Sequence, residues 1–285
     1  MSLPTENAPE PIKQDKPKTI FHKLPTRALL AIVTITFVVG WLINTPPGLE
    51  GKADAVGYAI CHQIVERSFS VNGKPVALCA RCTGMYLGAL LAMGYQLLLG
   101  KRRAEWPGKG ILAVLGIFFL AFAFDGSNSA AKLFLGHDLI YTPTNTLRLI
   151  TGTGMGIAMG VMILPTLNQT VWKAYDPRPY FLNWKQFAGL VAAGAVMVLL
   201  VLAEIPAILL TFSYLSAAGV VIILVMLYTM ILMVIFNSEN QVTEFKQMVP
   251  WLLGGILIAF MHIGAVDFLR YLLTGTWDGM HIDLG

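Results

Sequence analysis

The side chains best suited to chemistry in this sequence are three cysteines and a histidine in one short stretch. Cys61 and His62 are adjacent, Cys79 and Cys82 follow with two residues between them, and the chain has no other cysteine. Two thiolates at that spacing can reach one tetrahedral ion, and Cys61 with His62 would complete a set of three sulfur ligands and one nitrogen ligand. The spacing predicts a metal site, with zinc as the default ion and copper or iron as alternatives.

Two charged residues would support such a site. Glu66 follows His62 by one helical turn, and we expect it to orient the imidazole by a hydrogen bond. Arg81 stands between the last two cysteines, at the positive N-terminal end of the next apolar segment, and both features favour ionised thiols. We therefore expect Glu66 and Arg81 to be partners of the ligands.

The same cysteines are compatible with other chemistry. Because adjacent residues rarely bind one ion together, Cys61 or His62 could stand outside the coordination sphere, with His137 and Asp138 as substitutes. In thiol–disulfide exchange, the Cys-x-x-Cys pair would be the working pair, with Cys61 as the resolving thiol and a quinone as electron acceptor. A disulfide staple would leave one of the three thiols over. We favour metal coordination, then redox exchange, then the staple.

Further polar residues interrupt the apolar runs. Asp125 ends one run, where Asp-Gly is ordinary turn chemistry, and Asn145 or Thr144 is expected to cap the helix that begins the next. Arg148 lies one turn inside that run and needs a carboxylate, because burying an ionisable group near lipid costs at least about 2.5 kcal/mol. We expect Asp125 to pair with Arg148, forming a polar pocket with Asn145.

Three more charged residues fall at a similar depth, and we expect them to serve packing: Glu204, Asp267 and Arg270. The last two are separated by one helical turn and could neutralise each other.

The composition shows which solvent the chain must face. Of 285 residues, 56% are hydrophobic and 13% charged, and the mean hydropathy is +0.67. A soluble domain carries about twice that charged fraction. We therefore predict an all-α, polytopic transmembrane helical bundle, with the lipid bilayer as its partner. The basic residues form no stripe that could follow a phosphate backbone, which argues against nucleic-acid binding.

Seven apolar runs approach the length of about 20 residues that crosses a bilayer. The third is short, and the boundary around Glu204 is the weakest. The runs cover residues 28–43, 83–99, 111–124, 147–167, 187–202, 214–236 and 251–273. Residues 1–27 are polar and rich in lysine and proline, which predicts a disordered basic cytoplasmic tail before a single transmembrane domain over 28–285. Since no small-residue cleavage site is evident, we take the first run as a retained span.

The distribution of basic residues predicts the orientation. With the N-terminus inside, cytoplasmic segments hold most of the 20 Lys and Arg residues, including the cluster at 101–103, and the C-terminus lies outside. The thiols, Asp125 and Arg148 would then meet at the extracytoplasmic end of the bundle, in the cell membrane.

The first outer connection carries a helical pattern of its own. Val56, Ile60 and Ile64 recur every four residues, which predicts a short interfacial helix. Its other face would present Tyr58, His62 and Glu66.

Two of the apolar runs carry small residues at helical spacing. Gly84 and Gly88 in the second, and Gly152, Gly156 and Gly160 in the fourth, recur every four residues. Such faces let helices approach closely, so we expect packing there.

These motifs together resemble a family of predicted bacterial and archaeal membrane proteins named domain of unknown function 2085. The resemblance covers about residues 55–160 and rests on these segments: Cys61-His62-Gln63, Glu66-Arg67-Ser68-Phe69, Cys79-Ala-Arg81-Cys82-Thr83-Gly84, Asp125-Gly126, and Asn145-x-x-Arg148-x-x-Thr151-Gly152. It implies an integral membrane protein and supplies no activity, substrate or cofactor. The spans over 187–273 lie outside it, as additional spans.

The function predicted from these features is an extracytoplasmic Cys/His metal site beside an Asp/Arg pocket. A membrane thiol-disulfide oxidoreductase is the first alternative. A small-molecule transporter is the second, and it is disfavoured because the fourth to sixth runs are almost purely apolar and no inverted repeat is apparent. The sequence has no nucleotide-binding loop, serine-nucleophile elbow or HExxH motif, so whether the protein is an enzyme stays open.

Overall fold

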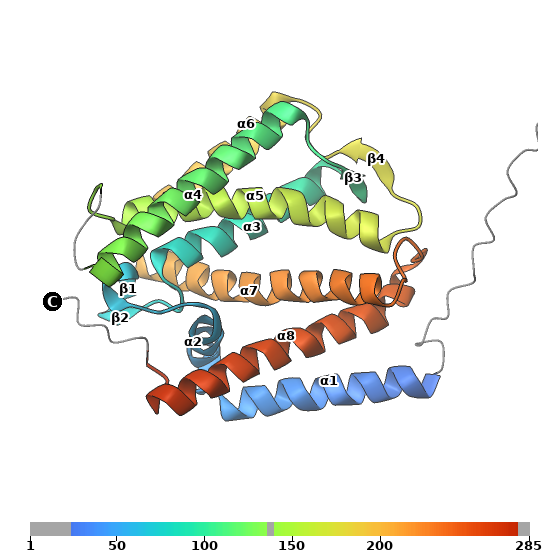
Figure 1. The fold of residues 1–285 in the computed structure, drawn as a ribbon, viewed down its shortest axis with the longest axis horizontal. Helices are drawn as coiled ribbons and strands as arrows, with labels where there is room; N and C mark the ends of the chain where they lie inside the picture. The colour runs from blue at the N-terminus through green and yellow to red at the C-terminus, as the bar shows by residue number, and fades with distance from the viewer. Residues whose placement is uncertain (1–23, 136–139, 279–285) are drawn as a thin grey trace, which may run out of the picture.

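The computed structural model describes residues 24–135 and 140–278, which form one bundle of helices (Figure 1). Seven of the described helices are long and apolar enough to cross a membrane: α1 (Leu24–Asn44), α3 (Ala80–Leu99), α4 (Lys109–Leu135), α5 (Asn145–Val171), α6 (Trp184–Leu202), α7 (Pro206–Ile235) and α8 (Phe245–Thr274). This confirms the predicted polytopic bundle of seven spans. Most of the predicted tail, residues 1–23, lies outside the described residues, as do His137 and Asp138, the substitute ligands; residues 24–27 lie in α1.

Short elements close the two ends of the bundle. At one end lie α2 (Gly48–Ile60), a single 3₁₀ turn (Val65–Arg67) and a hairpin of β1 (Ser70–Val71) and β2 (Lys74–Pro75); we call this end the thiol pole (Figure 1). The hairpin turns at Asn72 and Gly73, both with positive φ, as a two-residue Asn-Gly turn requires. At the opposite pole, β3 (Arg103–Glu105) pairs in parallel with β4 (Asp176–Pro179).

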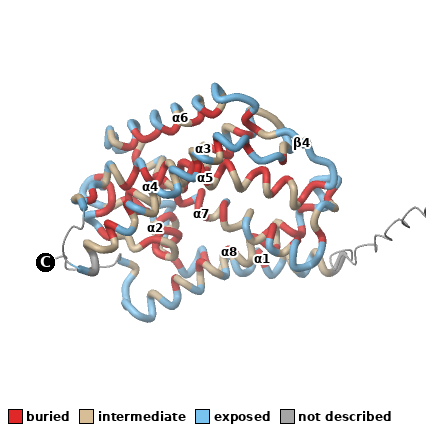
Figure 2. The backbone as a smooth tube through the Cα atoms, turned by 45° about the horizontal axis from the view of Figure 1, so that its top comes forward, coloured by how far each residue is buried: buried red, intermediate tan, exposed pale blue. Residues whose placement is uncertain are grey.

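The centre of the bundle is the pair α3 and α5. About half of the apolar window of each is buried, 50% and 56%, against 11% for α1 and 17% for α4. In Figure 2, α6 alternates between exposed and buried residues, as a helix with one face turned outward does. The outer helices therefore present their apolar side chains to lipid, and α3 with α5 forms the scaffold on which the thiol pole is built.

Glycines bring these two helices into backbone contact. A Cβ atom on Gly84 would meet the carbonyl oxygen of Leu149 at 2.5 Å, and one on Gly156 would overlap the carbonyl oxygen of Met85. A Cβ on Gly152 would overlap the carbonyl oxygen of Arg81, within the Cys-x-x-Cys segment itself. The close approach predicted for these small faces is confirmed, and it fixes the start of α3 against α5.

Some predicted boundaries differ from those in the structure. The third span does not end at a turn around Asp125-Gly126, because α4 continues through Leu135 and Asp125 lies inside the helix, fully buried. Asp-Gly often forms a turn, but here neighbouring side chains, described below, donate hydrogen bonds to the Asp125 carboxylate and let it stay inside a helix. An exposed turn separates α6 from α7 near Glu204, as predicted, but α7 begins at Pro206, ahead of the predicted start of the sixth run at residue 214.

The predicted helix through Ile64 also ends early. α2 stops at Ile60, Cys61 is extended, and Gln63 adopts a left-handed conformation with φ of 51°. The helix packs against α7 and α8, and Tyr58 is buried, with its hydroxyl bonded to Thr274 and Thr276. Tyr58, His62 and Glu66 thus do not share one helical face. Val56 and Ile64 are both buried although the chain leaves the helix at Cys61, so the four-residue apolar repeat does not mark one continuous helix.

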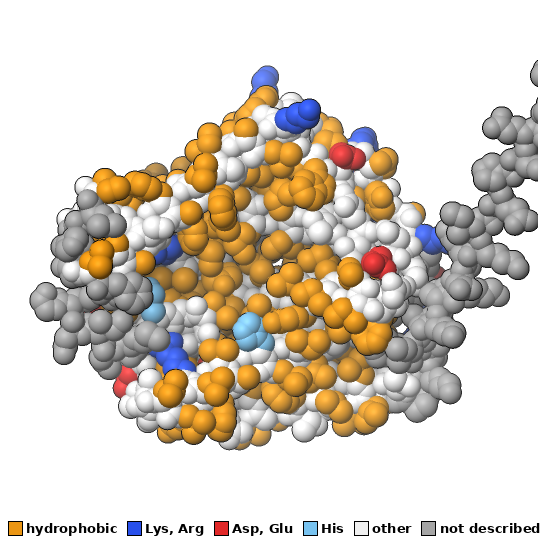
Figure 3. All heavy atoms as spheres, viewed as in Figure 1, with side chains coloured by type: hydrophobic (Ala, Val, Ile, Leu, Met, Phe, Trp, Pro, Cys, Tyr) orange, Lys and Arg blue, Asp and Glu red, His pale blue; other side chains and the backbone are white. Residues whose placement is uncertain are grey.

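The outer surface of the bundle suits a lipid environment. In the view of Figure 3, hydrophobic side chains cover the middle of the molecule, and acidic and basic side chains lie mainly toward its two ends. The exposed residues include Leu98, Leu199, Ile235 and Leu273, each more than 60% exposed. Burial of such residues in hydrocarbon replaces the burial that a soluble protein would need.

Candidate metal centre

The three cysteines come together at the thiol pole. Cys61 follows α2, Cys79 is the residue before the first turn of α3, and Cys82 lies in that turn. Their Sγ atoms all lie within 4.8 Å of one another, and none of the three forms a disulfide. The three-residue separation of Cys79 and Cys82 puts both thiols on one side of the helix start. Three thiols at this separation could hold one metal ion.

Cys61 is brought to the helix start by its neighbour Gln63. The Gln63 side-chain amide donates hydrogen bonds to the carbonyl oxygens of Asp54 (3.0 Å) and Ala77 (2.9 Å). It thereby joins the end of α2 to the segment that leads into Cys79. Sequence reasoning missed this role of Gln63, although the residue directly follows the Cys-His pair.

A second, unpredicted clamp comes from α8. The Arg270 guanidinium donates to the carbonyl oxygens of Tyr58 (2.6 Å), Cys61 (2.7 Å) and His62 (3.3 Å), and it stacks on the Tyr58 ring at 4.0 Å. The predicted neutralisation of Arg270 by Asp267 is therefore wrong. Asp267 instead accepts a hydrogen bond from the Trp41 indole at 2.9 Å. The turn at Cys61 offers the guanidinium three carbonyl acceptors, which satisfy several of its N–H donors at once.

The sulfur atoms are hydrogen-bonded to one another and to the backbone. Cys61 Sγ accepts hydrogen bonds from the backbone N–H groups of Cys79 (3.3 Å) and Gln63 (3.5 Å). Hydrogen bonds from Cys61 and Cys82, with a smaller one from His62, lower the pKa of Cys79 well below its usual value. The Cys79 thiolate and burial in turn raise the pKa of Cys61 to about 12. Within the cluster, these hydrogen bonds favour ionisation of Cys79 over that of Cys61.

His62 lies beside this cluster. Its imidazole contacts Cys79, and its Nδ1 accepts a hydrogen bond from the backbone N–H of Ile64 at 3.1 Å. It is not among the groups whose ligand atoms all lie within 4.8 Å of one another. Within the described residues no hydrogen bond joins it to Glu66, whose side chain is exposed. Of the predicted four-residue set, the structure brings together the three cysteines.

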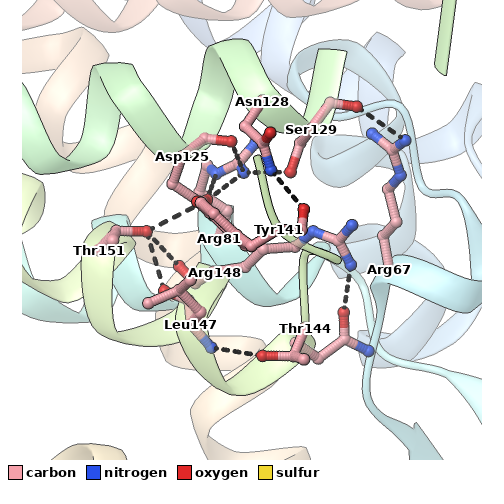
Figure 4. Close-up of polar contacts among 11 residues, drawn as sticks. Arg67, Arg81, Asp125, Asn128, Ser129, Tyr141, Thr144, Leu147, Arg148 and Thr151 are labelled. Carbon is pink, nitrogen blue, oxygen red and sulfur yellow. Dashed lines mark hydrogen bonds and ion pairs between the residues drawn. The ribbon is translucent and has the colours of Figure 1, made fainter. Parts of the chain in front are cut away.

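Arg81 connects the thiols to the buried carboxylate of Asp125. Its Nε lies 3.1 Å from Asp125 Oδ2, and its Nη2 pairs with the same oxygen and donates to Ser129 Oγ at 2.9 Å (Figure 4). The predicted Asp125–Arg148 pair is therefore wrong. Arg81 reaches Asp125 of α4 from the first turn of α3, whose backbone lies directly against α5 at Gly152.

Two other side chains complete the surroundings of Asp125. Tyr141 donates to its Oδ1 at 2.7 Å, and Thr151 donates to Oδ2 at 3.4 Å (Figure 4). Burial, and then the hydrogen bond to Asp125, raise the pKa of Tyr141 to about 12, so this hydroxyl keeps its proton. Sequence reasoning missed Tyr141, which lies between the predicted elements and carries no spacing signal.

Arg148 and Asn145 lie at the same pole. Arg148 Nη1 donates to Asn145 Oδ1 at 2.9 Å, and the Asn145 amide donates to the carbonyl oxygen of Glu66 at 3.1 Å. Of the two residues predicted as the helix cap, Thr144 is the one that caps α5, since its hydroxyl accepts from the N–H of Leu147. Asn145 is thus free to tie α5 to the segment between the cysteines, and the thiols, Asp125 and Arg148 share one end of the bundle.

Comparison with known proteins gives relatives and no reaction. A family model described as predicted membrane protein (DUF2085) matches residues 61–162. An uncharacterised protein of Methanocaldococcus jannaschii is 32% identical over 122 residues, which cover 42% of this chain and 72% of the relative. An uncharacterised protein of Methanothermobacter thermautotrophicus is 32% identical over 103 residues, 36% of this chain and 83% of the relative. No solved structure gives a significant match.

The matched region begins at the first cysteine and ends within α5, so it holds the thiols, Arg81, Asp125 and Arg148. The Arg270 clamp on α8 lies outside it. The resemblance drawn from the motifs is confirmed: the chain belongs to the DUF2085 family of predicted membrane proteins.

Proposed function

We propose that this membrane protein holds a metal ion between Cys61, Cys79 and Cys82. The observation that carries the proposal is the convergence of three unpaired thiols within 4.8 Å at the thiol pole. Zinc is the default ion for thiolate ligands with an added nitrogen or oxygen ligand, and copper or iron are the alternatives.

The surroundings of the thiols support coordination. Backbone N–H groups point at Cys61 Sγ, as they do around metal-bound thiolates, and they would stabilise the charge of the ligands. The Cys61 and Cys82 thiols donate to Cys79, so binding an ion would replace those protons and release them to solvent. Gln63 and Arg270 hold the Cys61 turn in place before any ion arrives.

The fourth ligand decides what the centre does. His62 already contacts Cys79, and a small rotation would offer its Nε2 to the ion. With His62 bound, a closed tetrahedral set would make the ion a structural clip on the outer connection. With His62 aside, water or substrate takes the open position, and metal-assisted hydrolysis becomes the chemistry available. In either case Arg81 and Glu66 are partners rather than ligands, and Asp125, Asn145 and Arg148 form the neighbouring polar pocket.

We place the centre on the extracytoplasmic side of the cell membrane. Arg102, Arg103 and Arg178 lie at the pole opposite the thiols, and the guanidinium of Arg102 stacks on Trp172 at 3.7 Å. The basic residues favour the cytoplasmic side for that pole. Residues 1–27 would then be a basic cytoplasmic tail before a single transmembrane domain over 28–285.

Elemental analysis of the detergent-purified chain tests the proposal. We expect close to one metal ion per wild-type chain, and its loss from Cys79→Ser and from Cys82→Ser. Ser70→Ala, an exposed change at the same pole, is the matched control and should keep the ion. A wild-type chain that stays folded and metal-free after growth with added zinc, copper and iron would refute the proposal.

A membrane thiol oxidoreductase is the second candidate, favoured by the lowered pKa of Cys79. A thiolate flanked by two thiols is the starting point of disulfide exchange. Forming a disulfide from the Cys79 thiolate and the Cys82 thiol would release two electrons and one proton, and a quinone could accept them together with a second proton from solvent. Acid-trapped thiol labelling separates the two candidates. A Cys79–Cys82 disulfide that reduces and reforms favours exchange, whereas three thiols protected by an ion favour coordination.

A further inference from the structure

Among the described residues, three arginines meet at the thiol pole, and one buried carboxylate pairs with them. Arg67, Arg81 and Arg148 converge there from three segments, as Figure 4 shows. Arg67 and Arg148 are 5% and 6% exposed. Among the described residues Asp125 is the one buried carboxylate bonded to this group, and Arg81 holds it. Glu66 is exposed and bonds to none of the three arginines.

The two remaining guanidinium groups are short of partners. Arg148 donates one hydrogen bond, to Asn145, and its buried Nε has no partner. Arg67 donates one, to the carbonyl oxygen of Ser129 at 3.2 Å. A guanidinium has several N–H donors in a planar fork, so most of the donors in this pair are unused. Burial, and then the like charge of Arg81, lower the pKa of Arg67.

Leaving such groups unpaired is costly. A buried charge without a counter-charge is strongly destabilising, and near lipid such groups pair or face a wet cavity. The neighbouring amides are already engaged. Asn128 bonds to the backbone of Tyr141 (Figure 4) and of Ile140, and Asn145 bonds to Arg148 and to the backbone of Glu66. The remaining guanidinium donors of Arg67 and Arg148 are therefore available to an added anion.

We propose that Arg67 and Arg148 bind the oxyanion of a phosphate monoester or of inorganic phosphate. Two guanidinium forks suit an oxyanion, because each can donate two parallel hydrogen bonds to it. A phosphate monoester carries a charge of about −1.5 to −2 at pH 7, opposite in sign to these two arginines, which form no ion pair with a carboxylate among the described residues. Neither arginine is a proposed metal ligand, and the site needs no ion at the thiols.

The ligand could be free phosphate or the headgroup of a lipid, and the experiment has one arm for each source. In the first, the full chain in phosphatidylcholine nanodiscs is titrated with inorganic phosphate, and binding is measured by calorimetry. In the second, nanodiscs contain phosphatidic acid, and the ³¹P resonance of its monoester is recorded. The variants are Arg148→Gln, Arg67→Gln and Arg148→Lys, and the control is Arg178→Gln, an exposed arginine at the opposite pole.

We expect saturable binding in at least one arm, and loss of each guanidinium should weaken it by about tenfold or more. Arg148→Lys keeps the charge without the fork and should fold where Arg148→Gln fails, with intermediate binding. Binding in the first arm identifies free phosphate, and a shifted resonance in the second identifies a lipid headgroup. Arg178→Gln should bind as wild type.

Cys82→Ser separates this proposal from the metal proposal. It removes a thiol ligand and should leave phosphate binding intact. If Cys82→Ser abolishes phosphate binding, the anion sits on the metal and the arginine site is refuted. The proposal also fails if the wild type binds in neither arm, or if Arg148→Lys and Arg67→Gln bind as tightly as wild type.

Discussion

At the scale of single residues, the structure separates groups that can do chemistry from groups that hold them. Cys61, Cys79 and Cys82 converge, whereas Gln63 and Arg270 position the turn that carries Cys61. The residue types and spacing of the cysteines were sufficient to predict the cluster. The partners of Arg81 and Arg270 could not be predicted, because each depends on which backbone approaches from a distant helix.

The Arg270 clamp leads to a prediction about metal affinity. Arg270→Met removes the donors that hold the carbonyl oxygens of Tyr58, Cys61 and His62. Loss of such a supporting partner typically lowers metal affinity by about 10- to 100-fold, so we expect zinc affinity to fall within that range. Competition with a chromogenic chelator measures it.

The control for this change is Arg178→Met at the opposite pole, which should bind zinc as wild type does. Because the guanidinium is also a packing group, Arg270→Lys serves as a milder change with the charge retained. If folded Arg270→Met and Arg270→Lys both bind zinc with wild-type affinity, the clamp has no part in the site.

At the scale of the elements, the pole is positioned by the contact of α3 with α5. The glycine spacing predicted that these faces would pack, and the structure shows their backbones in contact at Gly84, Gly152 and Gly156. The extent of α4 was not predictable from its sequence. Asp125-Gly126 resembles a turn until Arg81, Tyr141 and Thr151 supply hydrogen bonds that let the carboxylate stay in a buried helix.

The close contact of α3 with α5 at these glycines predicts that an added side chain there lowers the stability of the protein. Gly156→Ala would force a Cβ atom into the carbonyl oxygen of Met85, and overpacking of this kind costs about 1–3 kcal/mol. We expect a lower midpoint in thermal unfolding of the detergent-solubilised protein. Gly94→Ala, on α3 with nothing within 4 Å of the added Cβ, is the matched control.

The control should unfold at the wild-type temperature or above it, because alanine favours the helix over glycine by about 1 kcal/mol. Equal midpoints for the two variants would show that α3 and α5 do not approach as closely as described.

At the scale of the whole molecule, the three thiols and Asp125 lie at one pole, together with Arg67, Arg81 and Arg148. Basic residues near β3 and β4 mark the other. Seven spans could be predicted from hydropathy because lipid demands a long apolar run for each crossing. Hydropathy does not specify which helices are central. The contact of α8 with the thiol pole was therefore found only in the structure. This helix also lies outside the region matched by the family model.

The proposed orientation predicts which pole an impermeant reagent reaches. On a background with the three native cysteines changed to serine, Asn72→Cys places an exposed thiol at the thiol pole, and Arg178→Cys places one at the opposite pole. In intact cells a membrane-impermeant maleimide should label Asn72→Cys and spare Arg178→Cys. Inverted membrane vesicles should give the reverse, and labelling of Arg178→Cys alone in intact cells would reverse the orientation.

The account depends most on direct coordination by the three thiols, and X-ray absorption at the edge of the bound metal tests it. For the purified wild-type chain loaded with zinc, we expect a shell of three sulfur atoms at about 2.3 Å and one nitrogen or oxygen atom at about 2.0–2.2 Å. A first shell of nitrogen and oxygen alone, with no sulfur, would contradict the proposed metal centre.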